Sequence, residues 1–106
     1  MNKSYLSYTA AVILQTLDNG YQYGFDIMDV TGLPSGTVYP ALRRLEENGY
    51  IKGKWEKQAV AQQQQRPPRK YYELTKAGKA LLAEAIARYR LLEQSPLATA
   101  QPKEAE

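Results

Sequence analysis

Apolar residues recur along this chain at helical spacing in four segments and at strand spacing in two. Residues 4–18 are predicted to form the first helix, because their apolar side chains fall on one helical face: Leu6, Ala10, Ile13, Leu14 and Leu17. Ser4 is the expected N-cap. Asn19 and Gly20 tolerate left-handed backbone, so the helix is expected to end there.

A second, short helix is predicted over residues 23–30. Its apolar side is expected to be Phe25, Ile27, Met28 and Val30. Gly24 near its start is costly in a helix. We expect this cost to be tolerated because another segment of backbone approaches closely there.

The third helix is expected to begin at Ser35, Gly36 or Thr37. Pro40 favours the two later N-caps, because it has no N–H and fits best in a first turn. The buried stripe of this helix is predicted to be Val38, Ala41, Leu42 and Leu45. The Asn-Gly pair at 48–49 is expected to end it.

Two strands follow, joined by a polar segment. Residues 50–57 alternate as a strand does, with Ile51, Gly53 and Trp55 on one side, and Lys70–Leu74 is the predicted return strand. Residues 58–68 contain four consecutive glutamines and are expected to be a mobile hairpin tip, to which the glutamines add length rather than chemistry. Trp55 is expected to belong to a core or an interface rather than to a ligand platform.

A long final helix is predicted over residues 76–94, with Thr75 as its N-cap. Its apolar surface exceeds what so small a domain can cover, so a second copy of the chain is the expected partner. The alternative is that it folds back on the first helix within one chain. The predicted dimer interface is Leu6, Leu81, Leu82, Ala85, Ile86, Tyr89 and Leu92. Residues 95–106 are expected to be a disordered tail.

These elements predict a mainly α fold with a small β-hairpin, of the α+β class. A helix followed directly by a basic hairpin is what a winged helix-turn-helix DNA-binding domain needs. We assign residues 1–75 to that domain, residues 76–94 to a C-terminal dimerisation helix and the remainder to the tail.

Charge is unevenly distributed along the chain, whose net charge is only +3. Residues 34–80 carry ten Lys/Arg against four Asp/Glu, a net +6, whereas the segments before and after them sum to −2 and −1. A basic centre between mildly acidic flanks is typical of a protein that binds a polyanion. A solvated charged surface is the alternative.

The third helix is expected to contact double-stranded DNA, because the N-terminal half of such a helix reaches base edges in the major groove. The expected residues are Ser35, Gly36, Thr37, Tyr39, Pro40, Arg43 and Arg44. Hairpin cations are expected to lie along the sugar-phosphate backbone or in the minor groove. They are Lys54, Arg66, Arg69 and Lys70. The alternative for the helix arginines is a solvated face, paired with Glu46 and Glu47.

The absence of two residue types narrows the range of possible functions. The chain has no cysteine and no histidine, so disulfides, thiol chemistry, Cys- or His-based zinc sites and histidine bases are excluded. With no clustered carboxylates and no phosphate-binding glycine loop, we expect no enzyme, no metal and no cofactor. The chain has no run of roughly 18 apolar residues, so no membrane span is predicted. A cytoplasmic protein is expected.

Three motifs together resemble a known family. They read Tyr-Gly-Phe-Asp-Ile at 23–27, Ser-Gly-Thr-Val-Tyr-Pro-Ala-Leu-Arg-Arg-Leu-Glu-Glu-Asn-Gly-Tyr-Ile at 35–51, and Tyr-Tyr-Glu-Leu-Thr-Lys-Ala-Gly at 71–78. This pattern resembles the PadR family of bacterial transcriptional regulators over most of residues 4–93. The resemblance implies a winged-helix homodimer that represses transcription, with dimerisation through the C-terminal helix. The chain departs from the family at Tyr23, where histidine is usual, and in its glutamine-rich hairpin.

Two functions compete with the leading hypothesis, a sequence-specific repressor that binds a palindromic operator as a homodimer. One is a small-molecule sensor, in which an unknown effector, such as an aromatic drug, binds a pocket between protomers as the resemblance implies for some small members. The other is a protein-interaction module with a neutral recognition face. Arg43, Arg44 and Arg69 argue against that module.

Overall fold

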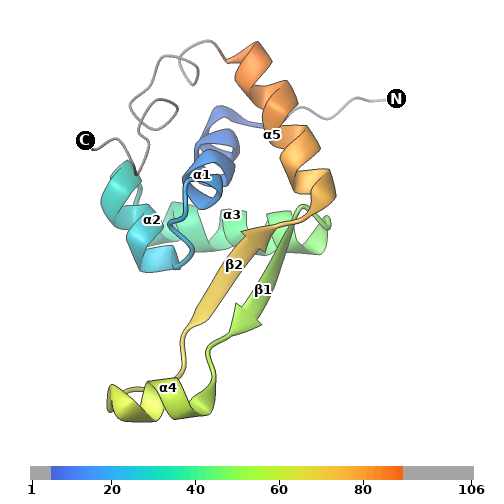
Figure 1. Ribbon diagram of the computed structural model, residues 1–106. Coiled ribbons are helices and arrows are strands. Elements are labelled where there is room, and N and C mark those ends of the chain that lie inside the picture. The colour runs from blue at the N-terminus through green and yellow to red at the C-terminus, as the bar shows by residue number, and fades with distance from the viewer. Residues whose placement is uncertain (1–5, 90–106) are drawn as a thin grey trace, which may run out of the picture.

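The computed structural model describes residues 6–89 of the chain. In chain order these residues form α1 (Tyr8–Asp18), α2 (Gly24–Thr31), α3 (Ser35–Glu47), β1 (Ile51–Trp55), α4 (Gln58–Gln63), β2 (Lys70–Leu74) and α5 (Lys76–Arg88). Four helices gather at one end, and the antiparallel hairpin β1–β2 projects from them with α4 at its tip (Figure 1). The predicted mainly α fold with a winged helix is confirmed.

The core forms around α1, which contacts α2, α3, α5 and β2. Ile13 and Leu14 of α1 are fully buried, as are Ile27 of α2 and Leu42 of α3. The predicted buried stripe of α3 is confirmed: Val38, Ala41, Leu42 and Leu45 are each less than 5% exposed. Of the predicted apolar side of α2, by contrast, Phe25 and Val30 are exposed, because only one face of so short a helix reaches α1.

The start of α3 differs from the prediction. Its N-cap is Pro34, not Gly36 or Thr37, and Pro40 lies inside the helix rather than in its first turn. Because proline has no N–H, the Gly36 carbonyl loses its helical partner. Gly36 is solvent-exposed, so water can satisfy that carbonyl.

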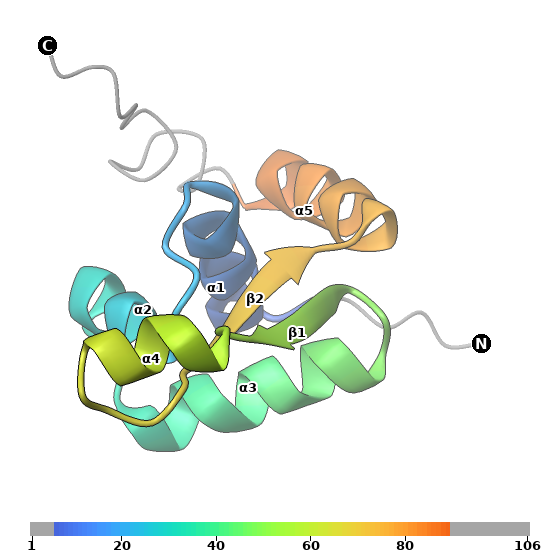
Figure 2. The same cartoon turned by 60° about the horizontal axis from the view of Figure 1, so that its bottom comes forward.

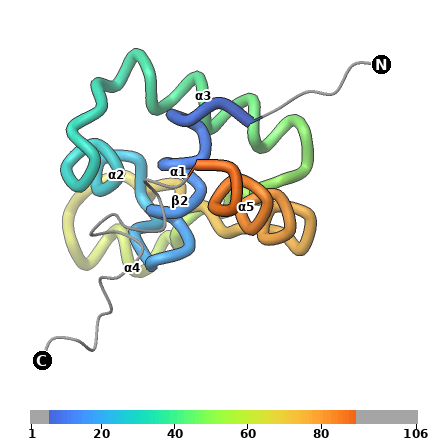
Figure 3. The backbone as a smooth tube through the Cα atoms, turned by 90° about the horizontal axis from the view of Figure 1, so that it is seen from above, coloured from blue at the N-terminus to red at the C-terminus, as the bar shows by residue number. Residues whose placement is uncertain are grey.

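The two helices that carry the predicted dimer surface are shorter than predicted. α1 begins at Tyr8, because the Ser7 hydroxyl accepts the Ala10 N–H at 3.1 Å, and the predicted cap Ser4 lies outside the described residues. α5 ends at Arg88 instead of residue 94, because Tyr89 turns away from helical geometry. The Tyr89 hydroxyl donates to the Leu6 carbonyl at 2.7 Å. α5 therefore packs back on α1 within one chain (Figure 3), which was the alternative arrangement.

The hairpin is anchored to the helices at one end and solvent-exposed at the other. In its register Ile51 pairs with Leu74 beside the core, and Trp55 pairs with Lys70 farther out. Ile51 is 2% exposed and Trp55 is 65% exposed. The prediction that Trp55 belongs to a core is therefore wrong within this protomer, because the strand carries it beyond the helices that could cover it.

The hairpin tip, expected as a mobile segment over residues 58–68, contains a helix that the sequence did not predict. α4 is capped at its end by Gln64, and Gln65 adopts a positive φ of 56°. The Ala61 carbonyl accepts the Arg66 N–H at 3.1 Å, which closes the turn. Alanine and glutamine are good helix formers, so the glutamines provide local structure as well as length.

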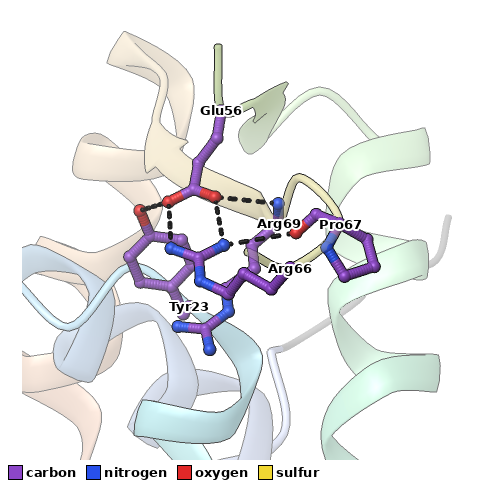
Figure 4. Close-up of polar contacts among 5 residues, drawn as sticks. All are labelled: Tyr23, Glu56, Arg66, Pro67 and Arg69. Atoms are coloured by element: carbon purple, nitrogen blue, oxygen red, sulfur yellow. Dashed lines mark hydrogen bonds and ion pairs between the residues drawn. The ribbon is translucent and has the colours of Figure 1, made fainter. Parts of the chain in front are cut away.

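The Glu56 carboxylate joins the hairpin tip to the segment before α2 (Figure 4). It accepts hydrogen bonds from the Arg66 guanidinium at 2.6 and 3.1 Å, from the Arg69 backbone N–H at 3.0 Å and from the Tyr23 hydroxyl at 3.1 Å. These donors, above all Arg66, lower the pKa of Glu56 from 4.5 to about 2. The wing therefore has a fixed attachment to the helical body.

The first turn of α5 passes against the chain that enters β1. The Thr75 hydroxyl accepts the Gly78 N–H at 3.1 Å and donates to the Gly49 carbonyl at 2.7 Å, so Thr75 is the N-cap, as predicted. A Cβ atom at position 78 would overlap the Tyr50 carbonyl oxygen. Glycine is therefore required there by the close approach of backbone.

Glu56 should contribute stability in a defined pH range. Because its pKa is lower in the folded chain, its stabilisation is complete above the ordinary pKa of 4.5 and is lost as pH falls towards about 2. We expect an NMR titration of its carboxyl to give a midpoint of about 2. Glu56→Gln should lower the melting temperature at neutral pH, and the difference should shrink below pH 4.5. A midpoint near 4.5 would contradict this.

Gly78→Ala should destabilise the fold, because overpacking against backbone costs typically about 1–3 kcal/mol. Thermal or urea unfolding would measure the loss. Gly36→Ala is the matched control, since a Cβ atom there meets nothing within 4 Å. If both substitutions changed stability equally, the close contact with Tyr50 would not be the cause.

Candidate nucleic-acid interface

The outward face of α3 carries the residues that were predicted to contact DNA. Ser35, Gly36, Arg43 and Arg44 are exposed, and Tyr39 is 42% exposed. Thr37 and Pro40 are half-buried. Figure 2 shows α3 along the outside of the molecule, next to the hairpin. The structure therefore brings this set together on one accessible helix.

Tyr39 is placed by its contact with α2. Its ring lies where a Cβ atom of Gly24 would otherwise be, so any larger residue at 24 would displace it. Gly24 is thus explained by an aromatic side chain and not, as predicted, by the approach of another backbone. Tyr39 therefore packs against α2 while part of its side chain remains accessible at the surface.

Arg43 and Arg44 have no carboxylate partner among residues 6–89. The ion pairs found there involve other cations, and Glu46 pairs with Lys70 at 3.2 Å instead. The alternative in which Glu46 and Glu47 neutralise these arginines is therefore not observed. Both guanidinium groups are exposed and can meet an external anion.

Most of the predicted wing cations, in contrast, are paired within the protein. Lys54 lies 2.9 Å from Glu73, and this contact raises the pKa of Lys54. Arg66 is held by Glu56, and Lys70 by Glu46. Only Arg69 of the four has a side chain with no carboxylate partner within the described residues; its guanidinium lies 4.7 Å from the centre of the Phe25 ring.

Sequence reasoning missed these carboxylate partners. Lys54 and Glu73 are diagonal neighbours across the hairpin, so the strand register could have suggested that pair. The Glu56–Arg66 pair depends on the path of α4, which no local pattern specifies. Sequence reasoning also missed a hollow of about 240 Å³ where the hairpin meets α2 and α3, lined in part by Phe25 and Trp55.

The predicted dimer residues differ in their accessibility. Leu82 and Ala85 are buried in the core of the protomer itself. Leu6, Leu81, Ile86 and Tyr89 are partly buried, and Leu92 lies outside the described residues. A second copy would therefore meet the partly buried residues, with Leu82 and Ala85 supporting them from beneath.

Residues 6–89 hold no group of three or more Asp or Glu residues that could bind a metal ion. The same part of the chain also contains no helix with the length and apolar character needed to cross a bilayer.

Solved structures of similar proteins share this architecture. A PadR-like transcription factor from Bacteroides fragilis is 30% identical, with 80% of this chain and 82% of that chain covered and a TM-score of 0.63. For a PadR family transcription regulator from Clostridium difficile R20291 these values are 28%, 83%, 93% and 0.69. Bacillus subtilis PadR, solved in complex with operator DNA, is 24% identical, with 77% of this chain and 48% of that chain covered and a TM-score of 0.65, a likeness of fold.

No curated protein matches the sequence. The model of the transcriptional regulator PadR-like family matches residues 13–84, which include α2, α3, the whole hairpin and the first turns of α5. The matched region holds both the exposed face of α3 and the wing. The chain belongs to the transcriptional regulator PadR-like family.

Proposed function

We propose that this chain is a sequence-specific DNA-binding repressor that acts as a homodimer on a palindromic operator. The observation that carries the proposal is the outward face of α3, where Arg43 and Arg44 are exposed and have no carboxylate partner in the described part of the chain. Membership of a family of transcriptional regulators supports it. So does the fold shared with a PadR protein that was solved on operator DNA.

The dimensions of α3 suit the major groove. The helix has 13 residues, which corresponds to a length of roughly 20 Å, and the groove is about 12 Å wide. Arginine can pair with two acceptors of guanine, so Arg43 could read a base as well as touch phosphate. The wing would lie along the adjacent sugar-phosphate backbone of the DNA.

Charge pairing in the wing limits what it can add to DNA affinity. Lys54, Arg66 and Lys70 each have a carboxylate partner. A phosphate would have to displace that partner, and the released carboxylate would then repel it. The wing therefore contributes less to DNA binding than its number of cations suggests. Contacts from α3 to the bases contribute correspondingly more.

Fluorescence anisotropy with the promoter region of the chain's own gene tests the proposal. We expect binding to that duplex to be tighter than to a scrambled duplex at two salt concentrations, and transcription from the promoter to fall when protein is added. Arg43→Ala should cost about 1–3 kcal/mol on the promoter and less on scrambled DNA. Lys79→Ala, an exposed cation on α5, is the control.

Equal losses on both duplexes would mean that Arg43 contacts phosphate only. Equal, weak and strongly salt-dependent binding of the parent protein to both duplexes would contradict sequence-specific recognition.

We further propose that the dimer forms through the surface shared by α1 and α5. Leu6 and Leu81 remain partly exposed there and border a hollow of about 430 Å³ that also reaches the polar side chains of Arg44 and Asn48. A second copy would cover these leucines, and two-fold symmetry would present two copies of α3 to the two halves of a palindrome. A small-molecule effector, the alternative function, would bind in the same hollow.

Leu81→Asp should convert the dimer to a monomer, because it would place a charge in an apolar interface. Sedimentation analysis should give twice the 12.0 kDa chain mass for the parent and the single mass for the variant. Ala87→Asp, at an exposed position of α5, should remain dimeric. A monomeric parent at micromolar concentration would overturn the dimer. Planar aromatic compounds that raise the melting temperature of the parent alone would favour the effector alternative.

A further inference from the structure

Five aromatic side chains and two cations line the hollow of about 240 Å³ between the hairpin and the N-terminal halves of α2 and α3. The hairpin contributes Trp55, Arg69 and Lys70, and the helices contribute Phe25 and Tyr39. No established role accounts for this combination. It lies between the two elements that we propose to face DNA.

Three of the five aromatic residues of this hollow are exposed. Trp55 is 65% exposed, Tyr39 42% and Phe25 38%. Large apolar groups that remain together on a surface commonly mark a binding site. Trp55 contributes little to the core of the protomer, and the exposure of its apolar ring to water is unfavourable. This exposure points to a partner that covers the ring.

The cations of the hollow lie over its rings. The Arg69 guanidinium is 4.7 Å from the centre of Phe25, and the Lys70 ammonium is 5.9 Å from the centre of Trp55. Flat apolar surface and positive charge thus alternate within a small area. A nucleic-acid strand has the complementary alternation of sugars or bases with phosphates.

Arg69 and Lys70 are not equivalent as phosphate ligands. Lys70 is already paired with Glu46 at 3.2 Å. Arg69 is exposed, and among residues 6–89 no carboxylate pairs with its guanidinium. The backbone of Arg69 is fixed by its N–H bond to Glu56, so the side chain extends from an anchored position.

We propose that this hollow receives the backbone of the DNA strand that passes between α3 and the wing. Trp55 packs on a deoxyribose of that strand, and Arg69 pairs with the neighbouring phosphate. This inference rests on the proposed DNA-binding function and adds to it an apolar contact from Trp55, which is not among the predicted DNA-binding residues. The contact from Trp55 is apolar, and the contact from Arg69 is ionic.

Trp55 is the only tryptophan of the chain, so its emission reports on this hollow directly. Titration of the full chain with the promoter duplex should change the emission along the same curve as the anisotropy. Trp55→Ala should weaken binding roughly tenfold, because it removes the apolar ring surface that the deoxyribose would bury. Trp55→Phe should retain most of the affinity.

Salt dependence separates the two proposed contacts. Trp55→Ala should leave the slope of log K against log salt unchanged, since no ion is released at an apolar contact. Arg69→Ala should make the slope shallower by about 0.9, the value for one lost phosphate contact. Val30→Ala is the control, because Val30 is an exposed apolar residue of α2 that does not line the hollow. Its affinity should stay within twofold of the parent.

Two results would overturn the proposal while leaving the proposed function intact. One is saturable promoter binding with unchanged tryptophan emission. The other is a Trp55→Ala variant that has native circular dichroism and binds within twofold of the parent. A parent that binds no duplex in the anisotropy assay would overturn the proposed function and this contact together.

Discussion

The burial of one face of α3 in the core is the constraint on which the rest of the structure depends. Val38 and Leu42 are fully buried there, so the helix cannot rotate without opening the core. Residues on the opposite face of the helix are consequently held outward, Tyr39 and Arg43 among them. The same apolar contacts that stabilise the domain thereby decide which side chains an external partner can reach.

The hairpin is positioned by polar contacts as well as apolar ones. Ile51 and Tyr72 hold its base in the core, whereas Glu56 connects its outer end to Tyr23 before α2. This second attachment lies beyond the reach of the apolar core, so the wing does not depend on its strand pairing alone.

The sequence allowed the helices to be predicted better than the wing, because helical patterns are local. The stripe from Val38 to Leu45 repeats within one helix and needs no knowledge of its neighbours. The tip helix α4 has only six residues, too few for a period to be recognised. The partners of Arg66 and Lys70 are 10 and 24 positions away in the chain. Such pairs follow from strand register and loop path, which spacing alone does not determine.

The internal pairing of wing cations changes what the net charge of this region implies for DNA binding. A net charge of +6 over residues 34–80 suggested a wing rich in phosphate contacts, yet Lys54 and Arg66 are engaged with carboxylates. Counterion release requires cations that reach phosphate, so paired cations contribute little to it. A wing of this kind needs non-ionic contacts to hold DNA, and an exposed aromatic ring is the group on this hairpin that can supply one. The exposed ring of Trp55 would therefore compensate for the neighbouring cations, which their carboxylate partners neutralise.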